Sequence, residues 1–282
     1  MAEAQPFEVA RDGFRLAGET SGDGPPVVLL HGLTASRRYV VHGSRTLERR
    51  DFQQIAYDAR GHGASEPAPE GEGYAYAELA ADLGRVIDEV ARERPAVLAG
   101  HSMGAHTLAA FALANPERVA AIVPIGPADT GAPATEDELA AWDALADGLA
   151  DDGIEGFLGA YDHGLDPQWR EVLLRVARER LGAHRHLDAV AAALRETPRS
   201  RPFDDVSELE FLDLPALVVA SHDDADPGHP YAIAEAWAAR LPRAKLISED
   251  PGQSPLAWQG GRLSRAIADF CETAEVAARL AA

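Results

Sequence analysis

The sequence contains a single cysteine and no long apolar run. Cys271 has no second cysteine to pair with, which excludes an intrachain disulfide and any metal cluster built from cysteines. No apolar stretch approaches the roughly 20 residues that a membrane-spanning helix needs. The first residues, MAEAQPFEVARDG, lack the basic segment and apolar run of a signal peptide. We therefore expect a cytoplasmic protein that does not bind membranes.

Basic residues are scarce as well. The 282 residues include 26 Lys and Arg against 46 Asp and Glu, for a formal net charge of −20, and Lys245 is the only lysine. This excess of negative charge repels phosphate backbones and anionic lipids, so neither nucleic acid nor a membrane surface is an expected partner. Hydrophobic residues make up 46% of the chain, which is typical of a globular protein with one large core.

The order of the apolar segments indicates an α/β fold. Strand patterns alternate with helical patterns up to about residue 127, which implies a mostly parallel sheet with right-handed crossovers. From 130 to 210 the patterns are only helical, and one of them begins with a capping box of Thr135 and Glu138. Strands then return, so we predict a core of residues 1–129 and 211–282 with a helical lid at 130–210. Other helices are expected at 38–50, 76–93, 104–115 and 263–280.

A serine between glycines carries the strongest chemical signal. Gly100-His101-Ser102-Met103-Gly104 fits the motif G-x-S-x-G and lies between a strand pattern and a helix pattern. So sharp a turn requires the glycines, and it exposes the Ser102 hydroxyl in a strained conformation. The first amides of the following helix point at the same place and favour a developing negative charge. In this setting the motif predicts a nucleophilic serine.

Three motifs together resemble those of the α/β-hydrolase-fold family over nearly the whole chain. Besides the serine motif, LLHGLTAS at 29–36 resembles the family's oxyanion loop, and AYDARGHGAS at 56–65 resembles its turn after the fourth strand. The resemblance implies a mostly parallel sheet of the eight-stranded type, helices on both faces, and a helical lid inserted after the sixth strand. It also implies an oxyanion hole formed by the backbone N–H groups of Leu33 and Met103.

The family places its catalytic acid after the seventh strand, where this chain has PALVVASHDDADPGHP. Counting forward from Pro215 selects Asp224, whereas counting back from Pro242 selects Asp226, and Asp223 is a third candidate. Two of these three carboxylates are expected only to cap the next helix or to face solvent. The sequence leaves the choice among them open.

The family's catalytic histidine is missing from its usual loop. That loop resembles G-x-G-H-S-P in the family, and this chain has GQSP at 252–255, with Gln253 at the histidine position. A carboxamide does not titrate near neutral pH, so it cannot act as a general base. His229 is the preferred replacement, although a solvent-facing role at a helix start fits it equally well. His163 in the lid is a second candidate, and Gln253 and Trp258 are expected to line the substrate pocket.

These features predict a serine hydrolase that cleaves a small carboxylic ester or lactone. Ser102 would attack the carbonyl carbon, and Asp224 or Asp226 would orient His229 as the base. No metal or organic cofactor is implied, the expected partner is a small-molecule substrate, and the sequence leaves a homodimer open. One alternative is a protein with an incomplete catalytic triad that only binds a small molecule under the lid. The other is a non-hydrolytic enzyme on the same scaffold.

Overall fold

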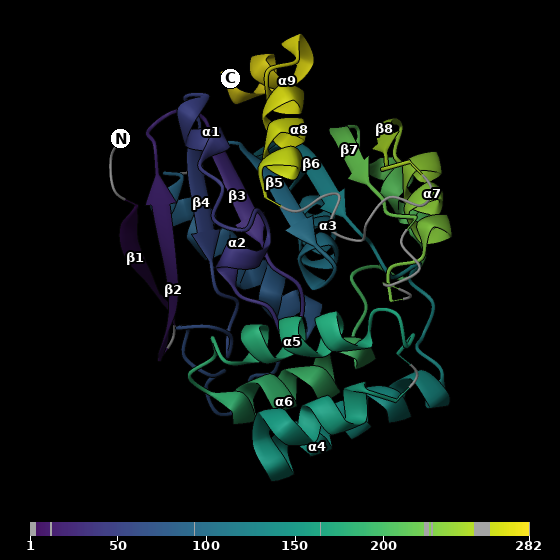
Figure 1. The fold of residues 1–282 in the computed structure, drawn as a ribbon. Helices are drawn as coiled ribbons and strands as arrows, with labels where there is room; N and C mark the ends of the chain where they lie inside the picture. The colour runs from purple at the N-terminus through teal and green to yellow at the C-terminus, as the bar shows by residue number, and fades with distance from the viewer. Residues whose placement is uncertain are drawn as a thin grey trace.

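A twisted eight-stranded sheet forms the centre of the molecule (Figure 1). The computed structural model describes residues 4–11, 13–92, 94–163, 165–222, 226, 228–250 and 260–281. The strands are β1 (Gln5–Arg11), β2 (Phe14–Ser21), β3 (Pro26–Leu30), β4 (Gln53–Tyr57), β5 (Ala96–His101), β6 (Val119–Ile125), β7 (Pro215–Val219) and β8 (Arg243–Ile247). The helices are α1 (Thr46–Arg49), α2 (Tyr76–Val90), α3 (Met103–Ala114), α4 (Glu136–Tyr161), α5 (Arg170–Leu181), α6 (Leu187–Glu196), α7 (Tyr231–Arg240), α8 (Gly261–Cys271) and α9 (Ala274–Leu280).

The sheet has the order β1-β2-β4-β3-β5-β6-β7-β8. Strands β3 to β8 pair in parallel, whereas β2 is antiparallel to both of its neighbours. The predicted mostly parallel sheet is therefore confirmed. Because the carboxyl ends of parallel strands meet at one edge, the loops that follow β3, β5, β6 and β7 come together there.

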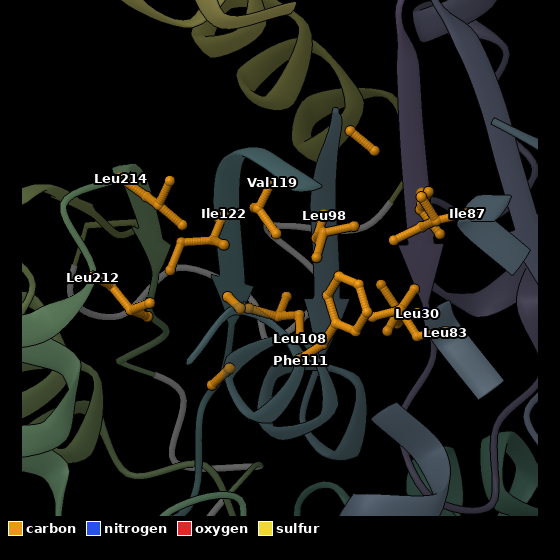
Figure 2. Packing of buried hydrophobic residues seen from close by; sticks show 14 of the residues in the cluster. Leu30, Leu83, Ile87, Leu98, Leu108, Phe111, Val119, Ile122, Leu212 and Leu214 are labelled. Atoms are coloured by element: carbon orange, nitrogen blue, oxygen red, sulfur yellow. The ribbon is translucent and has the colours of Figure 1, made fainter. Parts of the chain in front are cut away.

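Helices cover both faces of the sheet, which explains the continuous apolar runs of its central strands. On one face, Leu98 of β5 and Ile122 of β6 belong to the same buried cluster as Leu108 and Phe111 of α3 (Figure 2). On the other face, the alternate residues of these strands, such as Val97, pack with α1, α8 and α9. The sheet is thus fixed from both sides, and its carboxyl edge becomes a rigid base for the loops.

Helices α4 to α6 form a layer beyond the carboxyl edge of the sheet, between β6 and β7 in the chain (Figure 1). We call these helices and their connections the α4–α6 layer. The predicted capping box is present: the Thr135 hydroxyl accepts a hydrogen bond from the Glu138 amide, and the Glu138 carboxylate accepts one from the Thr135 amide. Gly153 leaves helical geometry with φ of 63°, so α4 consists of two packed segments.

Two of the expected helices are interrupted. Residues 38–50 form only a 3₁₀ turn, Arg37–Tyr39, and the short helix α1, because His42 and Gly43 adopt φ of 47° and 71°. A right-handed helix cannot continue through such residues. The helix expected at 263–280 is divided into α8 and α9 at Thr273, whose ψ of 143° is extended. In the described part of the chain no helix has both the length and the apolar character needed to cross a membrane.

A buried ion pair fixes the turn after β4. Arg60 is 0% exposed, and its guanidinium donates to both carboxylate oxygens of Asp82 at 2.7 and 2.9 Å. Asp82→Ala would leave the Arg60 charge buried without its main partner, so we expect the free energy of unfolding to fall by about 3–5 kcal/mol. Urea unfolding would measure this loss. Asp88→Ala is the control, since the Asp88–Arg118 pair is at the surface and should contribute about 1 kcal/mol or less.

Candidate active site

Ser102 occupies a strained turn between β5 and α3. Its φ of 52° and ψ of −116° lie outside the regions that side-chain-bearing residues normally adopt. The strain is enforced by close packing, because a side-chain carbon at Gly104 would lie 2.3 Å from the Leu30 carbonyl oxygen. The Ser102 amide donates to the Ile125 carbonyl at 3.0 Å, which ties the turn to the end of β6. Ser102 is half-buried, and its hydroxyl has no hydrogen bond with another described residue.

The backbone amides of Leu33 and Met103 are free donors in the described structure, since neither has a hydrogen bond with a described residue. His31 fixes the loop that carries Leu33. Its Nε2 accepts from the Ala59 amide at 2.9 Å, so its Nδ1–H donates to the Gly32 carbonyl at 2.8 Å. The carbonyl and N–H of one planar peptide point in opposite directions, so fixing the Gly32 carbonyl also fixes the direction of the Leu33 N–H.

His229 and Asp226 form a hydrogen-bonded pair after β7. The Nδ1 atom of His229 lies 2.8 Å from each carboxylate oxygen of Asp226. The His229 ring contacts the surroundings of the Ser102 turn: its centroid is 4.9 Å from that of His101, and a side-chain carbon on Gly126 would lie 3.5 Å from it. Nδ1–H donation to Asp226 leaves Nε2 of His229 able to exchange a proton.

The electrostatics of the site favour an ionised Asp226 beside an uncharged His101. Burial acts to raise the pKa of Asp226, but the hydrogen bond and charge of His229 outweigh it and hold that pKa below its ordinary value. Burial, followed by the charge of His229, lowers the pKa of His101 to about 3. Asp226 is therefore a carboxylate at neutral pH, and His101 is uncharged.

The comparisons with known proteins identify the family of this fold. A sequence profile described as "alpha/beta hydrolase fold" matches residues 25–259. The chain belongs to the alpha/beta hydrolase fold family. A protein of Variovorax paradoxus (strain S110) assigned as a carbamate hydrolase is 32% identical over 209 residues, which cover 72% of this chain and 75% of that protein.

Two further relatives extend the comparison. A protein of Mycobacterium phage D29 assigned as a non-heme haloperoxidase is 37% identical over 115 residues, but the match covers only 41% of this chain and 40% of that protein. The solved structure of a thermophilic esterase from Thermogutta terrifontis superposes with a TM-score of 0.75 at 24% identity, covering 95% of this chain and 98% of that one. This last likeness shows the family fold.

Several residues predicted from the family pattern lie outside the described structure. These are two of the candidate acids and two pocket residues: Asp223, Asp224, Gln253 and Trp258. Of the candidate acids, Asp226 is described, and it is the one bonded to His229. His163 is exposed just after α4, and no described contact joins it to Ser102 or His229.

Two imidazoles and a carboxylate converge at the site, and of these three residues only His101 was not among the candidates from the sequence. One ligating atom each of His101, Asp226 and His229 lies within 4.8 Å of the other two. These ligand types suit zinc or non-heme iron. The same three residues also suit proton transfer without a cation, because the Asp226–His229 hydrogen bonds already use one carboxylate and one ring nitrogen.

His184 joins the α4–α6 layer to the loops that follow β3 and β4, and no local sequence signal marks it. Its Nδ1 accepts from the Gly63 amide at 2.7 Å, and its Nε2–H donates to the Thr34 carbonyl at 2.9 Å. Its ring contacts His62, which in turn contacts His31. The partners are separated from His184 by 121 and 150 residues, so only folding brings them together.

Neutral imidazoles should make the folded chain acid-sensitive. Burial lowers the pKa of His184 to about 4 and that of His101 and His106 to about 3. Below pH 6.5 these histidines take up protons in the unfolded chain but not in the folded chain. The free energy of unfolding therefore decreases as the pH is lowered. At pH 5.5 each neutral imidazole lowers the free energy of unfolding by about 1.4 kcal/mol, which makes about 4 kcal/mol for the three.

Urea unfolding at pH 7.5 and 5.5 would measure this dependence. His184→Gln removes one of the three groups, so the stability difference between the two pH values should shrink by about 1.4 kcal/mol. His163→Gln, a change in an exposed imidazole, should leave that difference unaltered. An unchanged difference in the His184 variant would contradict the assignment of a neutral His184.

Proposed function

We propose that this chain is a serine hydrolase that cleaves a small carboxylic ester or lactone through an acyl-enzyme on Ser102. In this proposal His229 is the general base and Asp226 is the acid that orients it. The observation that carries the proposal is the Asp226–His229 pair, which lies against the turn that presents Ser102. It provides an imidazole near the nucleophile, although the family position for that histidine holds Gln253.

In this mechanism the same residues act first in the acylation of Ser102 and then in its deacylation. The Ser102 hydroxyl transfers its proton to Nε2 of His229 as its oxygen bonds to the carbonyl carbon. The amides of Leu33 and Met103 donate to the oxygen that becomes negative. The proton on His229 then passes to the leaving alkoxide as the C–O bond breaks. Water repeats the sequence on the acyl-enzyme, releasing the acid and regenerating Ser102, so no cofactor takes part.

Two features support hydrolysis of an ester-type bond. The turn at Ser102 maintains backbone strain that a purely structural serine would not need. The Variovorax relative is assigned as a carbamate hydrolase, and the Thermogutta structure is an esterase, so related chains act on acyl bonds to oxygen or nitrogen. The small-molecule substrate would enter between the α4–α6 layer and the carboxyl edge of the sheet.

The second candidate function is binding of a small molecule without turnover. It is favoured by the lack of a hydrogen bond between the Ser102 hydroxyl and any described imidazole. In such a protein the strained turn would be inherited from an enzyme, and the site would only hold its ligand. A non-hydrolytic enzyme on the same fold would differ from both by turning over without an acyl-enzyme.

A fluorophosphonate probe tests the proposal, because it reacts covalently with an activated serine. We expect labelling of Ser102, identified by peptide mass spectrometry, together with hydrolysis of short-chain esters or lactones followed in a pH-stat. An unlabelled Ser102 with no turnover of any ester or lactone would contradict the hydrolase. Turnover without labelling would favour the non-hydrolytic enzyme.

A further inference from the structure

One arginine of the α4–α6 layer has no partner for its charge. Among the described arginines, Arg180 alone is half-buried and has neither a hydrogen bond nor an ion pair from its guanidinium to a described residue. Its Nε atom is buried and unsatisfied. The described arginines that likewise show no side-chain partner are all exposed, where water solvates them: Arg38, Arg85, Arg92, Arg175, Arg185 and Arg265.

Two other arginines of α5 do have carboxylate partners. Arg170 pairs with Asp162, and Arg178 pairs with Glu155, in exposed ion pairs. Carboxylates are abundant, since Asp and Glu outnumber Lys and Arg by 46 to 26. A half-buried guanidinium without a carboxylate is costly because it loses part of its hydration without compensation. The guanidinium of Arg180 is therefore available to a group that is not part of the described chain.

The end of α5, which carries Arg180, is tied to the loops at the carboxyl edge of the sheet. It stands at the end of α5, beside Leu181, which is buried in the core of the α4–α6 layer. Four residues later His184 is hydrogen-bonded to the loops at Thr34 and Gly63. In Figure 1, α5 is the helix of the layer that lies nearest the sheet, between it and α4 and α6. The end of α5 is therefore held close to the carboxyl edge where Ser102 lies.

The charge of Arg180 acts on the catalytic groups. It contributes to the lowered pKa of His101, after burial and His229, and to that of Asp226, where burial opposes the shift. It also opposes the increase in the pKa of Tyr161 that burial causes. The guanidinium charge thus acts on His101, Asp226 and Tyr161. Asp226 does not neutralise it by contact, because its hydrogen bonds go to His229.

We propose that Arg180 binds a carboxylate of the substrate, so that the enzyme cleaves esters or lactones that carry a free acid group. A guanidinium presents parallel N–H donors that match the two oxygens of a carboxylate. A monoanion is preferred over a phosphate dianion, since Asp226 and the net charge of −20 repel the second negative charge. This assignment rests on the proposed hydrolase function and names its substrate class.

Paired substrates that differ only by one methyl group on the second carboxyl test this assignment. We would compare monomethyl and dimethyl esters of succinic, glutaric and adipic acids by pH-stat, with kcat/KM as the readout. For at least one chain length the wild type should prefer the monoacid, and Arg180→Met should reduce the monoacid-to-diester ratio about 10- to 100-fold, as loss of a charge-assisted bidentate contact implies. Arg175→Met is the matched control: it removes the same charge from an exposed position on α5 and should leave the ratio unchanged.

A binding experiment separates this proposal from the hydrolase mechanism. Isothermal titration calorimetry with succinamate, glutaramate and adipamate, in which an amide replaces the ester, requires no turnover. The wild type should bind one of them at least about 10-fold more tightly than Arg180→Met does. If all three bind the wild type no better than the variant, or if the diesters are cleaved without any charge preference, the anion site is wrong while the hydrolase stands. Binding without any ester turnover would instead retain the anion site and reject the hydrolase.

The folding of the variant provides a further check. Methionine fills a similar volume and removes an unpaired half-buried charge, so Arg180→Met should melt at the same temperature as the wild type or higher. A substantially lower melting temperature would mean that the guanidinium already has a structural partner, and would overturn the proposal.

Discussion

Replacing Ser102 with alanine should abolish ester hydrolysis and labelling by the fluorophosphonate probe. Without the hydroxyl no acyl-enzyme forms, and only the oxyanion donors and substrate binding remain to accelerate the reaction. In serine hydrolases this loss amounts to about 10⁴-fold or more in kcat. Alanine retains the backbone strain at φ of 52°, so the free energy of unfolding should change by about 0.5 kcal/mol or less.

The control for this variant is Ser264→Ala. Ser264 is a buried serine of α8 whose hydroxyl donates to the Gly260 carbonyl at 2.9 Å, and it belongs to no part of the proposed site. Its replacement should leave kcat/KM within about two-fold of wild type. Hydrolysis that persists in the Ser102 variant at more than a tenth of the wild-type rate would show that the reaction does not pass through an acyl-enzyme on this serine.

His229→Gln should lower kcat by about 10⁴-fold, and Asp226→Asn by a similar factor. Glutamine can hydrogen-bond but cannot accept the Ser102 proton. Asparagine at 226 no longer favours the tautomer with hydrogen on Nδ1, so it leaves the wrong nitrogen facing the nucleophile. Because the two residues act as one unit, the double variant should lose little more activity than either single variant. Steady-state kinetics on one ester would show this non-additivity.

His163→Gln distinguishes the two candidate bases, since it makes the same chemical change at an exposed position after α4. It should leave kcat near the wild-type value. If His163→Gln abolished turnover and His229→Gln did not, the base would come from the α4–α6 layer. The family pattern offers one more comparison: Gln253→His in the His229→Gln background should restore activity if the base has moved from 253 to 229.

Local patterns predicted the elements that depend on neighbours in the chain. The alternation of strand and helix patterns identified the parallel sheet, and the capping box placed the start of α4. Helix continuity at 38–50 was predicted wrongly, since periodicity does not report the positive φ of His42. Packing against the core can impose such a conformation at an energetic cost that local propensity does not include.

The candidate site also combines features that the sequence predicted with features that only the structure revealed. The serine turn could be predicted because its geometry demands glycines within two residues of Ser102. The acid could not, because Asp223, Asp224 and Asp226 lie within four residues and the family spacing fits more than one of them. Asp226 emerged through its hydrogen bonds to His229. The isolation of Arg180 from every described carboxylate is likewise a property of three-dimensional packing.

The sequence by itself thus determined the fold family, the sharp turn at Ser102 and the absence of a histidine at 253, since each depends on residue type and spacing along the chain. Only the tertiary structure decided that Asp226 pairs with His229, that His184 joins the α4–α6 layer to the loops, and that the Arg180 charge has no described partner. The physical reason is distance: electrostatic and hydrogen-bond partners are chosen within a few ångströms in space, and the chain brings them there from separate loops.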